Sequence, residues 1–359
     1  MIKLFTYPLS MIYGLIISSR NFLYDSNILH HHNYEVPVIS VGNLTVGGTG
    51  KTPHAEYLIN ILRKEFKVAF ISRGYKRKSK GFILATSQST INDIGDEPVQ
   101  IKQKYPDVTV AVSKKRDTAI RNILNNKDLN IDVIILDDAF QHRRVEPNIN
   151  ILLFDFTQPV YDDMLLPAGK LRESIKSSYR ANFIIFTKCP GQLKPIDQRI
   201  IKNKLDIRPY QNLFFTSIVY GEITPAEKGR TLFFDDMLKY TVMLVTGIAN
   251  PSPLIGYLKD QVGDIIHKKF PDHYAYTEKD LDDIYNSFKE IDNKRKLIIT
   301  TEKDLVRLKA INKYPEGFFD ILYYIPIEIK FLDRTKDLFN KRILTYVREN
   351  KSNSRLHKR

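Results

Sequence analysis

Short apolar runs alternate with longer amphipathic segments along this 359-residue chain. Apolar runs rich in β-branched residues predict buried strands, and apolar positions three and four residues apart predict helices. Strands are predicted over Val36–Val41, Lys67–Ser72, Asp107–Ser113, Asp132–Asp138, Asn150–Asp155, Asn182–Lys188 and Asn212–Tyr220. Helices are predicted over Pro53–Lys64, from Gly95 onward and over Lys114–Asn125. This alternation is typical of a mostly parallel, doubly wound α/β sheet.

A second, smaller α/β pattern follows the connecting segment Gly221–Arg230. Thr277 and Thr301 each precede an aspartate by three residues, and this spacing predicts two helix capping boxes, the first for a helix that ends near Glu290. The remaining elements are strands over Thr241–Thr246, Lys296–Thr301 and Asp320–Ile325, a helix over Arg334–Arg348 and a polar, basic tail over Glu349–Arg359. We therefore expect an N-terminal region (1–30), a P-loop NTPase-like domain (31–220), a smaller C-terminal α/β domain (221–330) and a terminal helix with its tail (331–359).

The N-terminal segment Met1–Tyr24 is apolar but is interrupted by Pro8, Ser10 and Gly14. It is shorter than the roughly 20 uninterrupted apolar residues that a membrane-spanning helix needs. It also lacks a good signal-peptide cleavage site. We expect an interfacial helix whose apolar side chains enter a membrane while Lys3 and Arg20 stay among the headgroups. A helix packed in the domain core is the alternative.

Composition narrows the class of protein further. A hydrophobic fraction of 43% and a charged fraction of 27% are those of a folded globular chain. The formal net charge of +14 favours an acidic partner, which charge alone leaves open as a nucleotide, a nucleic acid or an anionic membrane surface. Cys189 is the only cysteine, so an internal disulfide and a C-x-x-C metal site are excluded.

The segment Val36–Thr52 predicts a phosphate-binding loop between a strand and a helix. Glycines leave main-chain N–H groups free to surround phosphate oxygens, and the start of the helix adds its positive dipole end. Lys51 would reach the β- and γ-phosphates, and the Thr52 hydroxyl would bind Mg²⁺. Thr45 stands where the usual pattern has its first glycine, so a flexible loop that happens to contain Gly-Lys-Thr remains an alternative. The residues predicted to bind the nucleotide are Thr45, Val46, Gly47, Gly48, Thr49, Gly50, Lys51 and Thr52.

A second magnesium anchor is predicted at the end of a neighbouring strand. Asp137 and Asp138 follow four apolar residues, and ligands of open α/β sheets bind at the carboxyl ends of the strands. A strand that merely ends in a polar turn is the alternative. A GTPase usually carries N/T-K-x-D after a late strand, but Pro190 replaces that aspartate here, so ATP is the expected nucleotide.

Phosphoryl transfer to an alcohol also needs a group that accepts the hydroxyl proton. Asp96 is a candidate, although an aspartate beside Pro98 at a helix start also suits a helix cap. His273 could orient or share that proton, or it could be a surface histidine. The basic loop Arg73–Lys80 suits a phosphorylated ligand or an anionic lipid, or it is a solvated charged face.

Together these motifs resemble one family, the tetraacyldisaccharide 4'-kinases, which are the lipid A 4'-kinases of Gram-negative bacteria. The resemblance extends from about Leu9 to Leu308. It rests on SVGNLTVGGTGKTP (40–53), SRGYKR (72–77), GDEP (95–98), DDAFQHRR (137–144), LPAGKLRE (166–173), GIANP (247–251), FPDHY (270–274) and TEKDLVRL (301–308). The family's loop resembles Thr45–Thr52 in lacking the first glycine. Ala139 is a small departure, because the family leads us to expect glycine there.

The resemblance implies phosphorylation of the 4'-hydroxyl of a tetraacylated glucosamine disaccharide 1-phosphate with ATP and Mg²⁺. It also implies a monotopic enzyme on the cytoplasmic face of the inner membrane, and we expect a monomer. By motif, Asp96 resembles the general base assisted by His273, with Lys51 and Asp138 also catalytic. The resemblance further implies Thr52, Glu97, Asp137 and Asp138 at the metal, Gln141 near the nucleotide, and Arg73, Tyr75, Arg116, His142 and Arg172 at the substrate.

Two other classes of function remain for comparison. A P-loop GTPase or ATPase switch that serves as a binding module would hydrolyse its nucleotide without an acceptor and would not need Asp96. A basic ATPase that binds nucleic acid is not supported, because the chain shows no interleaving of aromatic and basic residues and no recognised nucleic-acid motif. We therefore expect no nucleic-acid partner.

Overall fold

The chain forms two compact units, and the computed structural model describes residues 2–227 and 229–356. The first unit comprises Met1–Gln88, Ile101–Ile218 and Ile329–Arg359, and the second comprises Ser89–Gln100 and Val219–Glu328. Ser89–Gln100 groups with the second unit although it precedes most of the first unit in the chain, and residues 1–30 and 331–359 group with the first unit.

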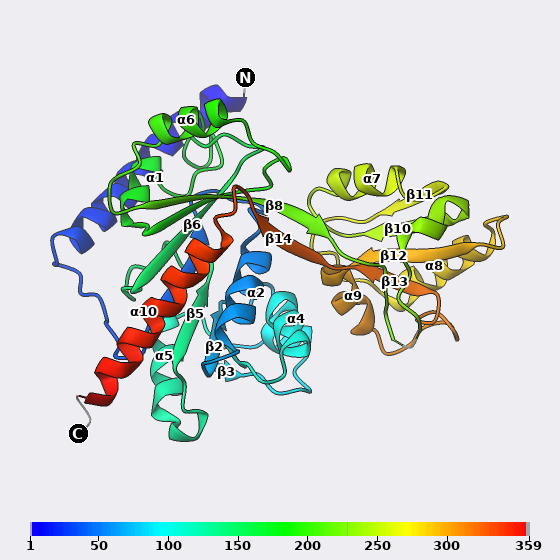
Figure 1. Cartoon of the computed structure of the whole chain (residues 1–359), viewed down its shortest axis with the longest axis horizontal. Helices are drawn as coiled ribbons and strands as arrows, with labels where there is room; N and C mark the ends of the chain where they lie inside the picture. Colours follow the sequence, from blue (N-terminus) through cyan, green and yellow to red (C-terminus); the bar gives the residue numbers. More distant parts are fainter. Residues whose placement is uncertain (1, 228, 357–359) are drawn as a thin grey trace. The chain divides into compact units, whose positions relative to one another are not determined.

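The first unit contains a nine-stranded sheet with the order β14-β8-β7-β6-β1-β5-β2-β4-β3 (Figure 1). Its strands are β1 (Val38–Asn43), β2 (Val68–Ser72), β3 (Ile83–Leu84), β4 (Thr109–Val112), β5 (Val133–Asp137), β6 (Ile149–Asp155), β7 (Phe183–Thr187), β8 (Asn212–Tyr220) and β14 (Ile327–Phe331). The strands from β8 to β4 are parallel, and β3 is antiparallel to β4. The central strand β1 lies between β5 and β6, so the turn that follows it opens at the middle of the sheet.

Helices cover both faces of this sheet. Phe339 of α10 packs against Phe183 of β7 and Phe214 of β8. The next residue of β7, Ile184, faces the other way and shares a core with Ile201 of α6. The α-helices of the first unit are α1 (Ile2–Asp25), α2 (Lys51–Leu62), α4 (Asp96–Lys104), α5 (Arg116–Asn125), α6 (Pro195–Lys204) and α10 (Lys336–Leu356), with 3₁₀ turns η1 (Lys127–Leu129) and η2 (Ile175–Arg180). The chain crosses from the second unit to the first within α4.

The second unit contains a five-stranded sheet with the order β11-β10-β12-β13-β9. Its strands are β9 (Thr224–Pro225), β10 (Thr241–Thr246), β11 (Asp264–Lys269), β12 (Lys296–Thr301) and β13 (Leu322–Ile325), and its helices are α3 (Ile91–Ile94), η3 (Phe234–Lys239), α7 (Ser252–Lys259), α8 (Glu278–Lys289) and α9 (Glu302–Lys309). Consecutive residues of β10 point to opposite faces of the sheet. Leu244 packs with Leu254 of α7, and Val245 packs with Leu281 of α8 and Leu305 of α9. Both units are therefore α/β layers with a largely parallel sheet, as predicted.

The element predictions hold where apolar runs are long. The predicted bounds of β8, β10 and β12 match those of the structure, and Thr277 forms the predicted capping box of α8. The sequence did not predict α6, α7, β11 or β14, and β11 shows why, because its exposed and partly buried residues form no apolar run. The predicted tail is also helical as far as Leu356, with Arg348 and Lys351 paired to Glu65 and Asp132. Met1 and residues 357–359 of the predicted segments lie outside the described residues.

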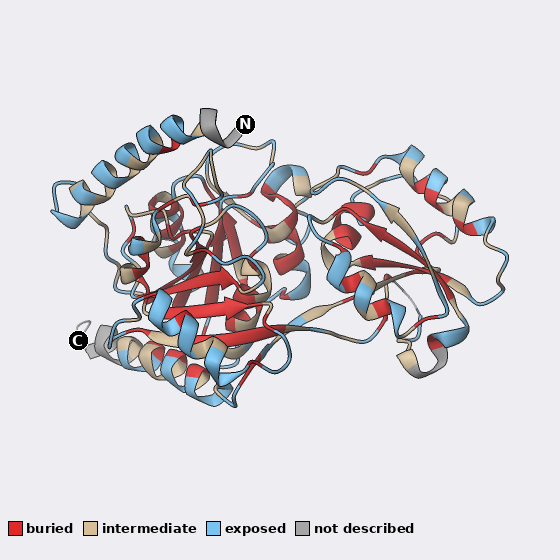
Figure 2. Cartoon of the chain, turned by 90° about the horizontal axis from the view of Figure 1, so that it is seen from above, coloured by how far each residue is buried: buried red, intermediate tan, exposed pale blue. Residues whose placement is uncertain are grey.

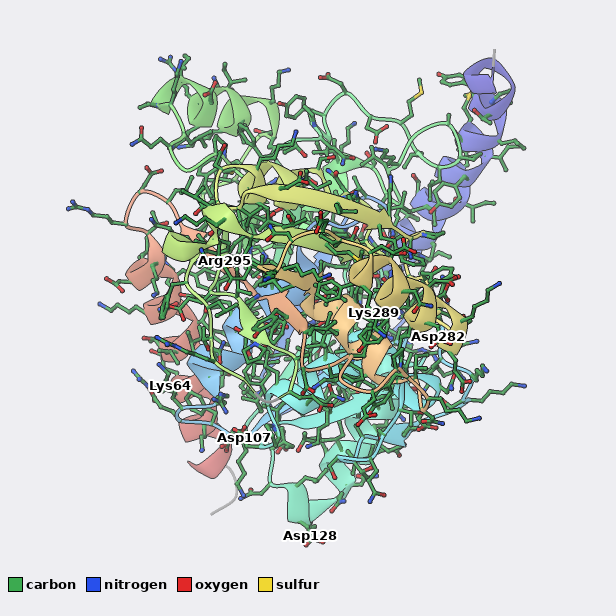
Figure 3. All side chains as sticks on the ribbon, turned by 90° about the vertical axis from the view of Figure 1, so that its right-hand side faces the viewer. Lys64, Asp107, Asp128, Asp282, Lys289 and Arg295 are labelled. Carbon is green, nitrogen blue, oxygen red and sulfur yellow. The ribbon has the colours of Figure 1, made fainter. Side chains whose placement is uncertain are left out.

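Charged residues outside the buried clusters lie on the surface. Lys64, Asp107, Asp128, Asp282, Lys289 and Arg295 are all exposed (Figure 3). Such residues form the solvated faces that a charged fraction of 27% requires, and they provide controls for the buried charges described below.

The N-terminal helix α1 is exposed along one side (Figure 2), as expected of an interfacial helix, and its other side packs on the domain. Leu9, Ile12, Leu15, Ile16 and Phe22 are each more than half exposed. No helix among the described residues is long and apolar enough to cross a membrane. Lys3 and Arg20 were expected among the headgroups. The side chain of Lys3 lies outside the described part of α1, and the expectation for Arg20 is wrong, because its guanidinium pairs with the buried Glu173.

Candidate active site

The predicted phosphate loop lies between β1 and α2, at the centre of the first unit's sheet. Gly47 has a φ angle of 115° and Gly50 one of 82°, values that favour glycine because a Cβ atom would strain the main chain. A Cβ atom added to Gly47 or Gly48 would meet no other atom within 4 Å, so the loop borders open space. The helix begins at Lys51, two residues before the predicted start.

Buried polar contacts fix the far side of the loop. The Asn43 side chain donates to Thr49 Oγ1 at 2.9 Å, and the Thr187 hydroxyl donates to the Thr49 carbonyl at 2.9 Å. The Lys188 ammonium donates to the Gly48 carbonyl and lies 2.6 Å from the Asp155 carboxylate. In the sequence, Lys188 was notable only as part of the incomplete guanine motif. In the structure, Lys188 holds the phosphate loop through the Gly48 carbonyl.

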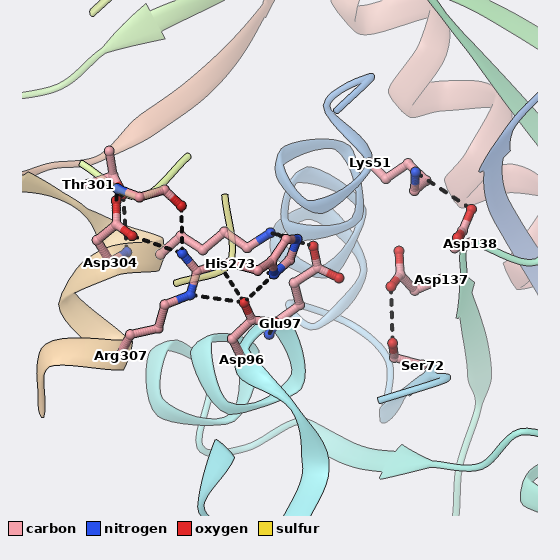
Figure 4. Close-up of polar contacts among 12 residues, drawn as sticks. Lys51, Ser72, Asp96, Glu97, Asp137, Asp138, His273, Thr301, Asp304 and Arg307 are labelled. Carbon is pink, nitrogen blue, oxygen red and sulfur yellow. Dashed lines mark hydrogen bonds and ion pairs between the residues drawn. The ribbon is translucent and has the colours of Figure 1, made fainter. Parts of the chain in front are cut away.

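Lys51, Asp138 and Arg172 form a charged cluster beside the loop (Figure 4 shows the first two). Lys51 Nζ lies 3.6 Å from Asp138 Oδ1, and Arg172 Nη1 lies 3.0 and 3.1 Å from the two carboxylate oxygens of Asp138. Burial alone would raise the pKa of Asp138, but Lys51 and Arg172 hold that pKa below its ordinary value. Asp138 also adopts a left-handed φ of 46°, which aspartate tolerates better than most residues.

Asp137 ends β5, directly beside β1, as the sequence predicted. Its carboxylate accepts a hydrogen bond of 3.1 Å from the Ser72 hydroxyl (Figure 4). Arg116 is 1% exposed and donates to the main-chain carbonyls of Asp137 and Ser113. Burial lowers the pKa of this guanidinium to about 10. Arg116 thus braces the end of β5 through the main chain.

The other residues predicted for nucleotide and substrate lie in the same unit. Gln141 donates to the Asn43 carbonyl at 2.8 Å, at the start of the phosphate loop. Arg73 and Tyr75 are exposed in the loop that follows β2. His142 is partly buried, and burial together with the charge of Arg116 lowers its pKa to about 4. His142 is therefore neutral at physiological pH.

The residues beside the loop suit a magnesium nucleotide. Magnesium prefers oxygen ligands and usually takes one or two carboxylates together with phosphate oxygens and water. Thr52, Asp137 and Asp138 provide one hydroxyl and two carboxylates in the first unit. No group of three or more His, Cys, Asp or Glu residues that could hold a metal alone occurs in the described part of the chain. The donor set therefore fits an ion shared with phosphate.

A second cluster surrounds Asp96 in the second unit (Figure 4). Asp96 is 6% exposed, and its Oδ2 lies 3.0 Å from His273 Nδ1 and 2.6 Å from Arg307 Nη2. Its Oδ1 accepts a hydrogen bond of 2.9 Å from the main-chain N–H of Glu97. Burial alone would raise the pKa of Asp96, but His273, Lys303 and Arg307 hold it far below the usual range. The structure thus brings together the two residues predicted from separate motifs.

Arg307 joins this cluster to two further motifs. Its Nη1 donates to Asp304 Oδ1 at 2.8 Å and to the Gly247 carbonyl at 2.9 Å. Asp304 is fully buried and accepts hydrogen bonds from the Gly247 N–H and the Thr301 hydroxyl. Thr301 caps α9 by accepting from the Asp304 N–H, but the predicted capping box is incomplete. The Asp304 carboxylate accepts from the Thr301 hydroxyl, Arg307 and the Gly247 N–H. Every hydrogen-bonding atom of this carboxylate has a defined role.

Glu97 pairs with Lys303 at 2.9 Å, in the same unit as Asp96. The motif TEKDLVRL (301–308) contains Lys303, Asp304 and Arg307, but its sequence predicted only a capping role for Asp304 and no role for the two basic residues. Lys303 and Arg307 are four residues apart, so they share one face of α9. That spacing of two basic residues was the signal that could have identified them.

Comparisons with known proteins give a consistent result. The family model described as tetraacyldisaccharide-1-P 4'-kinase matches residues 2–348. The tetraacyldisaccharide 4'-kinase of Bacteroides thetaiotaomicron is 45% identical over 362 residues, which cover 98% of this chain and 95% of the relative. The protein of the same name from Phocaeicola vulgatus is 46% identical over 351 residues, with 97% and 96% covered.

A crystal structure of LpxK from Aquifex aeolicus in complex with ATP has the same fold. The two structures match with a TM-score of 0.75 at 29% sequence identity, over 97% of this chain and 99% of the other. The match extends over nearly the whole of both chains, so both α/β units belong to the shared architecture.

Proposed function

This chain belongs to the tetraacyldisaccharide 4'-kinase family, and from that premise we propose a division of the catalytic work among its residues. The activity is phosphorylation of the tetraacyldisaccharide at its 4'-position, in lipid A biosynthesis. In our proposal the phosphoryl donor is ATP with Mg²⁺, and the acceptor is the 4'-hydroxyl of a tetraacylated glucosamine disaccharide 1-phosphate.

The observation that carries this proposal is the open glycine loop with Lys51 at its end. Main-chain N–H groups of the loop and the start of α2 bind phosphate oxygens, and Lys51 neutralises charge that builds up on the transferred group. When bound, the magnesium nucleotide supplies the phosphoryl group and an electrophilic metal. Thr52, Asp137 and Asp138 are the residues we assign to the metal, and the pairing of Asp138 with Lys51 and Arg172 holds that carboxylate ionised.

We assign proton removal from the acceptor hydroxyl to Asp96, assisted by His273. The strongly lowered pKa keeps Asp96 ionised at neutral pH but makes it a weak proton acceptor by itself. His273 Nδ1, 3.0 Å from the carboxylate, provides a second place for the proton. Arg307 holds Asp96 Oδ2 and is a positioning residue in this scheme. Glu97 remains a proposed metal ligand or metal support, and its carboxylate pairs with Lys303.

Substrate recognition is proposed for the exposed basic loop and its neighbours. Arg73 and Tyr75 are accessible to a phosphorylated headgroup, and Arg172 and His142 lie in the same unit. Arg116 is a proposed phosphate or substrate contact as well, although its burial favours a supporting role at the end of β5.

We propose that the protein acts at the cytoplasmic face of the inner membrane as a peripheral, monomeric enzyme. Its α1 helix exposes Leu9, Ile12, Leu15 and Ile16, which suits insertion among acyl chains. The net charge of +14 suits an anionic leaflet and a phosphorylated lipid. Replacing the exposed apolar side chains of α1 by serine should weaken sedimentation of the protein with vesicles of anionic phospholipid, and a melting curve checks that folding is retained.

The proposal is tested by transfer of label from γ-labelled ATP in detergent micelles. The acceptor is the tetraacyldisaccharide 1-phosphate, and the control acceptor is the same lipid with its 4'-hydroxyl blocked. We expect label in the lipid only when that hydroxyl is free. Label that appears only as free inorganic phosphate would contradict the kinase and would support a nucleotide-hydrolysing switch.

A further inference from the structure

The two sides of α1 differ in chemistry. The outward side carries the exposed apolar residues, whereas the opposite side carries Ser10, Tyr13, Gly14, Ile17 and Arg20 at spacings of three and four residues. Ser10 is only 5% exposed, and a Cβ atom on Gly14 would lie 2.8 Å from Leu165 Cδ1. The polar side of α1 is therefore packed against the protein, and the question is what it packs against.

The polar side of α1 contacts the segment Asp163–Glu173 through four of its residues, while the last turn of the helix also contacts Arg143 and Tyr179. The Ser10 hydroxyl donates to the Leu165 carbonyl at 2.9 Å and accepts from the Ala168 N–H at 2.9 Å. The Tyr13 hydroxyl donates to the Arg172 carbonyl at 2.9 Å. These contacts join residues more than 150 positions apart in the chain, so they fix where the segment lies relative to the helix.

A buried carboxylate at the end of the segment also pairs with α1. Glu173 is fully buried, and Arg20 Nη2 lies 2.7 Å from its Oε1. Asn21 donates to Oε2 at 3.2 Å, and Arg180 also pairs with Oε2. A buried carboxylate needs such partners, because an unpaired charge away from water is strongly destabilising. Two of its three partners come from α1, so this part of the segment depends on the helix.

The same segment also touches the phosphate loop. The Val46 N–H donates to the Lys170 carbonyl at 2.9 Å, and the Arg172 N–H donates to the Leu44 carbonyl at 2.6 Å. Thr45 and Leu171 form an antiparallel bridge between these bonds. The Arg172 guanidinium in turn holds Asp138. A single short segment thus has α1 on one side and the start of the nucleotide loop on the other.

We propose that α1 positions the phosphate loop as well as contacting the membrane, and that Ser10, Tyr13 and the Arg20–Glu173 pair are positioning residues for nucleotide binding. Packing of α1 fixes the position of Asp163–Glu173, including Arg172. This segment in turn fixes the main chain of Thr45 and Val46 at the start of the phosphate loop. The proposal rests on the proposed function, because it takes the loop at Thr45–Thr52 to bind ATP. It predicts that ATP affinity depends on the polar side of α1 even when no membrane is present.

The test compares matched variants of the full-length protein. Tyr13→Phe removes one hydrogen bond and keeps the ring, and Tyr7→Phe alters a tyrosine that is 49% exposed on the same helix. Ser10→Ala is paired in the same way with Ser19→Ala, which is exposed. We expect Tyr13→Phe and Ser10→Ala to raise the KM for ATP about two- to tenfold, the factor that corresponds to one hydrogen bond. The kcat at saturating ATP and the KM of both controls should stay unchanged.

Further variants distinguish the role of α1 in positioning the phosphate loop from its role in binding the membrane. Arg20→Ala should raise the KM for ATP, and Arg20→Lys should restore most of the affinity, because the lysine ammonium can still pair with Glu173. Leu15→Ser and Ile16→Ser, on the exposed side, should weaken sedimentation with anionic vesicles and leave the KM for ATP unchanged. Melting temperatures of all variants check that folding is retained.

The outcomes separate this inference from the proposed function. Binding of ATP itself, measured by calorimetry without lipid, replaces the KM if the wild-type protein transfers no label to the lipid. Weaker ATP binding in Tyr13→Phe and Ser10→Ala, but not in their controls, supports the inference. Unchanged ATP affinity in both variants, or an equal loss in Leu15→Ser and Ile16→Ser, would overturn it and leave α1 as an anchor alone.

Discussion

The phosphate loop of the first unit and the Asp96 cluster of the second unit are built in opposite ways. The loop is one continuous stretch, Thr45–Thr52, whose main chain borders open space at Gly47 and Gly48. The Asp96 cluster is built from side chains of separate motifs, and Asp96, Asp304 and Arg307 are nearly or fully buried. A site for an external anion must leave its donors available, whereas a site that holds a proton acceptor must compensate the buried charge internally.

The largest expected effect is the loss of the proton acceptor. Asp96→Ala should lower kcat by roughly 10²–10⁴, the usual contribution of a general base, while ATP binding is retained. Label transfer measures the rate, and calorimetry measures ATP affinity. The control Asp282→Ala removes an exposed carboxylate of the same unit. Unchanged turnover in Asp96→Ala would remove this residue from its role and would leave the cluster as a structural device.

A smaller loss of activity is expected for a substitution in the phosphate loop, and here ATP binding should be weakened as well. Lys51→Ala should lower kcat/KM for ATP by about 10²–10³, as for other groups that stabilise developing charge, and should weaken ATP binding. Lys64→Ala, just beyond the end of α2, is the exposed control. If Lys51→Ala bound ATP as well as the wild type and turned over at the same rate, the loop assignment would be wrong.

Arg307 tests whether the second cluster positions its carboxylate. Arg307→Ala should lower kcat by about 10², because a small displacement of a catalytic group costs about that factor. Guanidinium ion, added below the unfolding transition, should restore part of the rate by occupying the space beside Asp96 and Asp304. Arg295→Ala provides an exposed control. A full rate in Arg307→Ala would show that His273 and the Glu97 N–H orient Asp96 without Arg307.

The last expected effect is on stability and not on rate, and it is a pH dependence at His54, two residues after the phosphate loop. Burial lowers the pKa of His54 to about 4, and its ring nitrogens contact the Gly50 carbonyl and the Thr216 hydroxyl. The unfolded chain binds this proton near pH 6.5 but the folded chain only near pH 4, so stability falls as the pH drops between these values. The loss attributable to His54 is about 3 kcal/mol.

His54→Gln should therefore flatten the fall in unfolding free energy between pH 6.5 and pH 4, measured by urea titration at each pH. His30→Gln, at an exposed position, should leave the wild-type curve unchanged. Equal slopes for wild type and His54→Gln would contradict the buried, neutral histidine.

The phosphate loop could be predicted from the sequence more fully than the Asp96 cluster. The phosphate loop could be located from sequence, because strand, glycines, lysine and helix are contiguous and each has a local physical reason. Asp137 could be placed beside it, because parallel strands end at the same edge of a sheet. From sequence, a shared proton between Asp96 and His273 was one of two open alternatives that the family resemblance then favoured, because 177 positions separate the two residues. For Arg307 and Lys303, the sequence offered only one signal, which is their four-residue spacing on one helix.

The sequence alone determined the two α/β patterns, the nucleotide loop and the apolar N-terminal helix, because periodicity and glycine placement act over a few neighbouring residues. Only the tertiary structure decided that Arg116 faces the main chain, that Arg307 holds Asp96, and that the polar side of α1 meets the segment before Glu173. These facts depend on which distant side chains share a buried volume. There, each charge must find a partner that local sequence does not reveal.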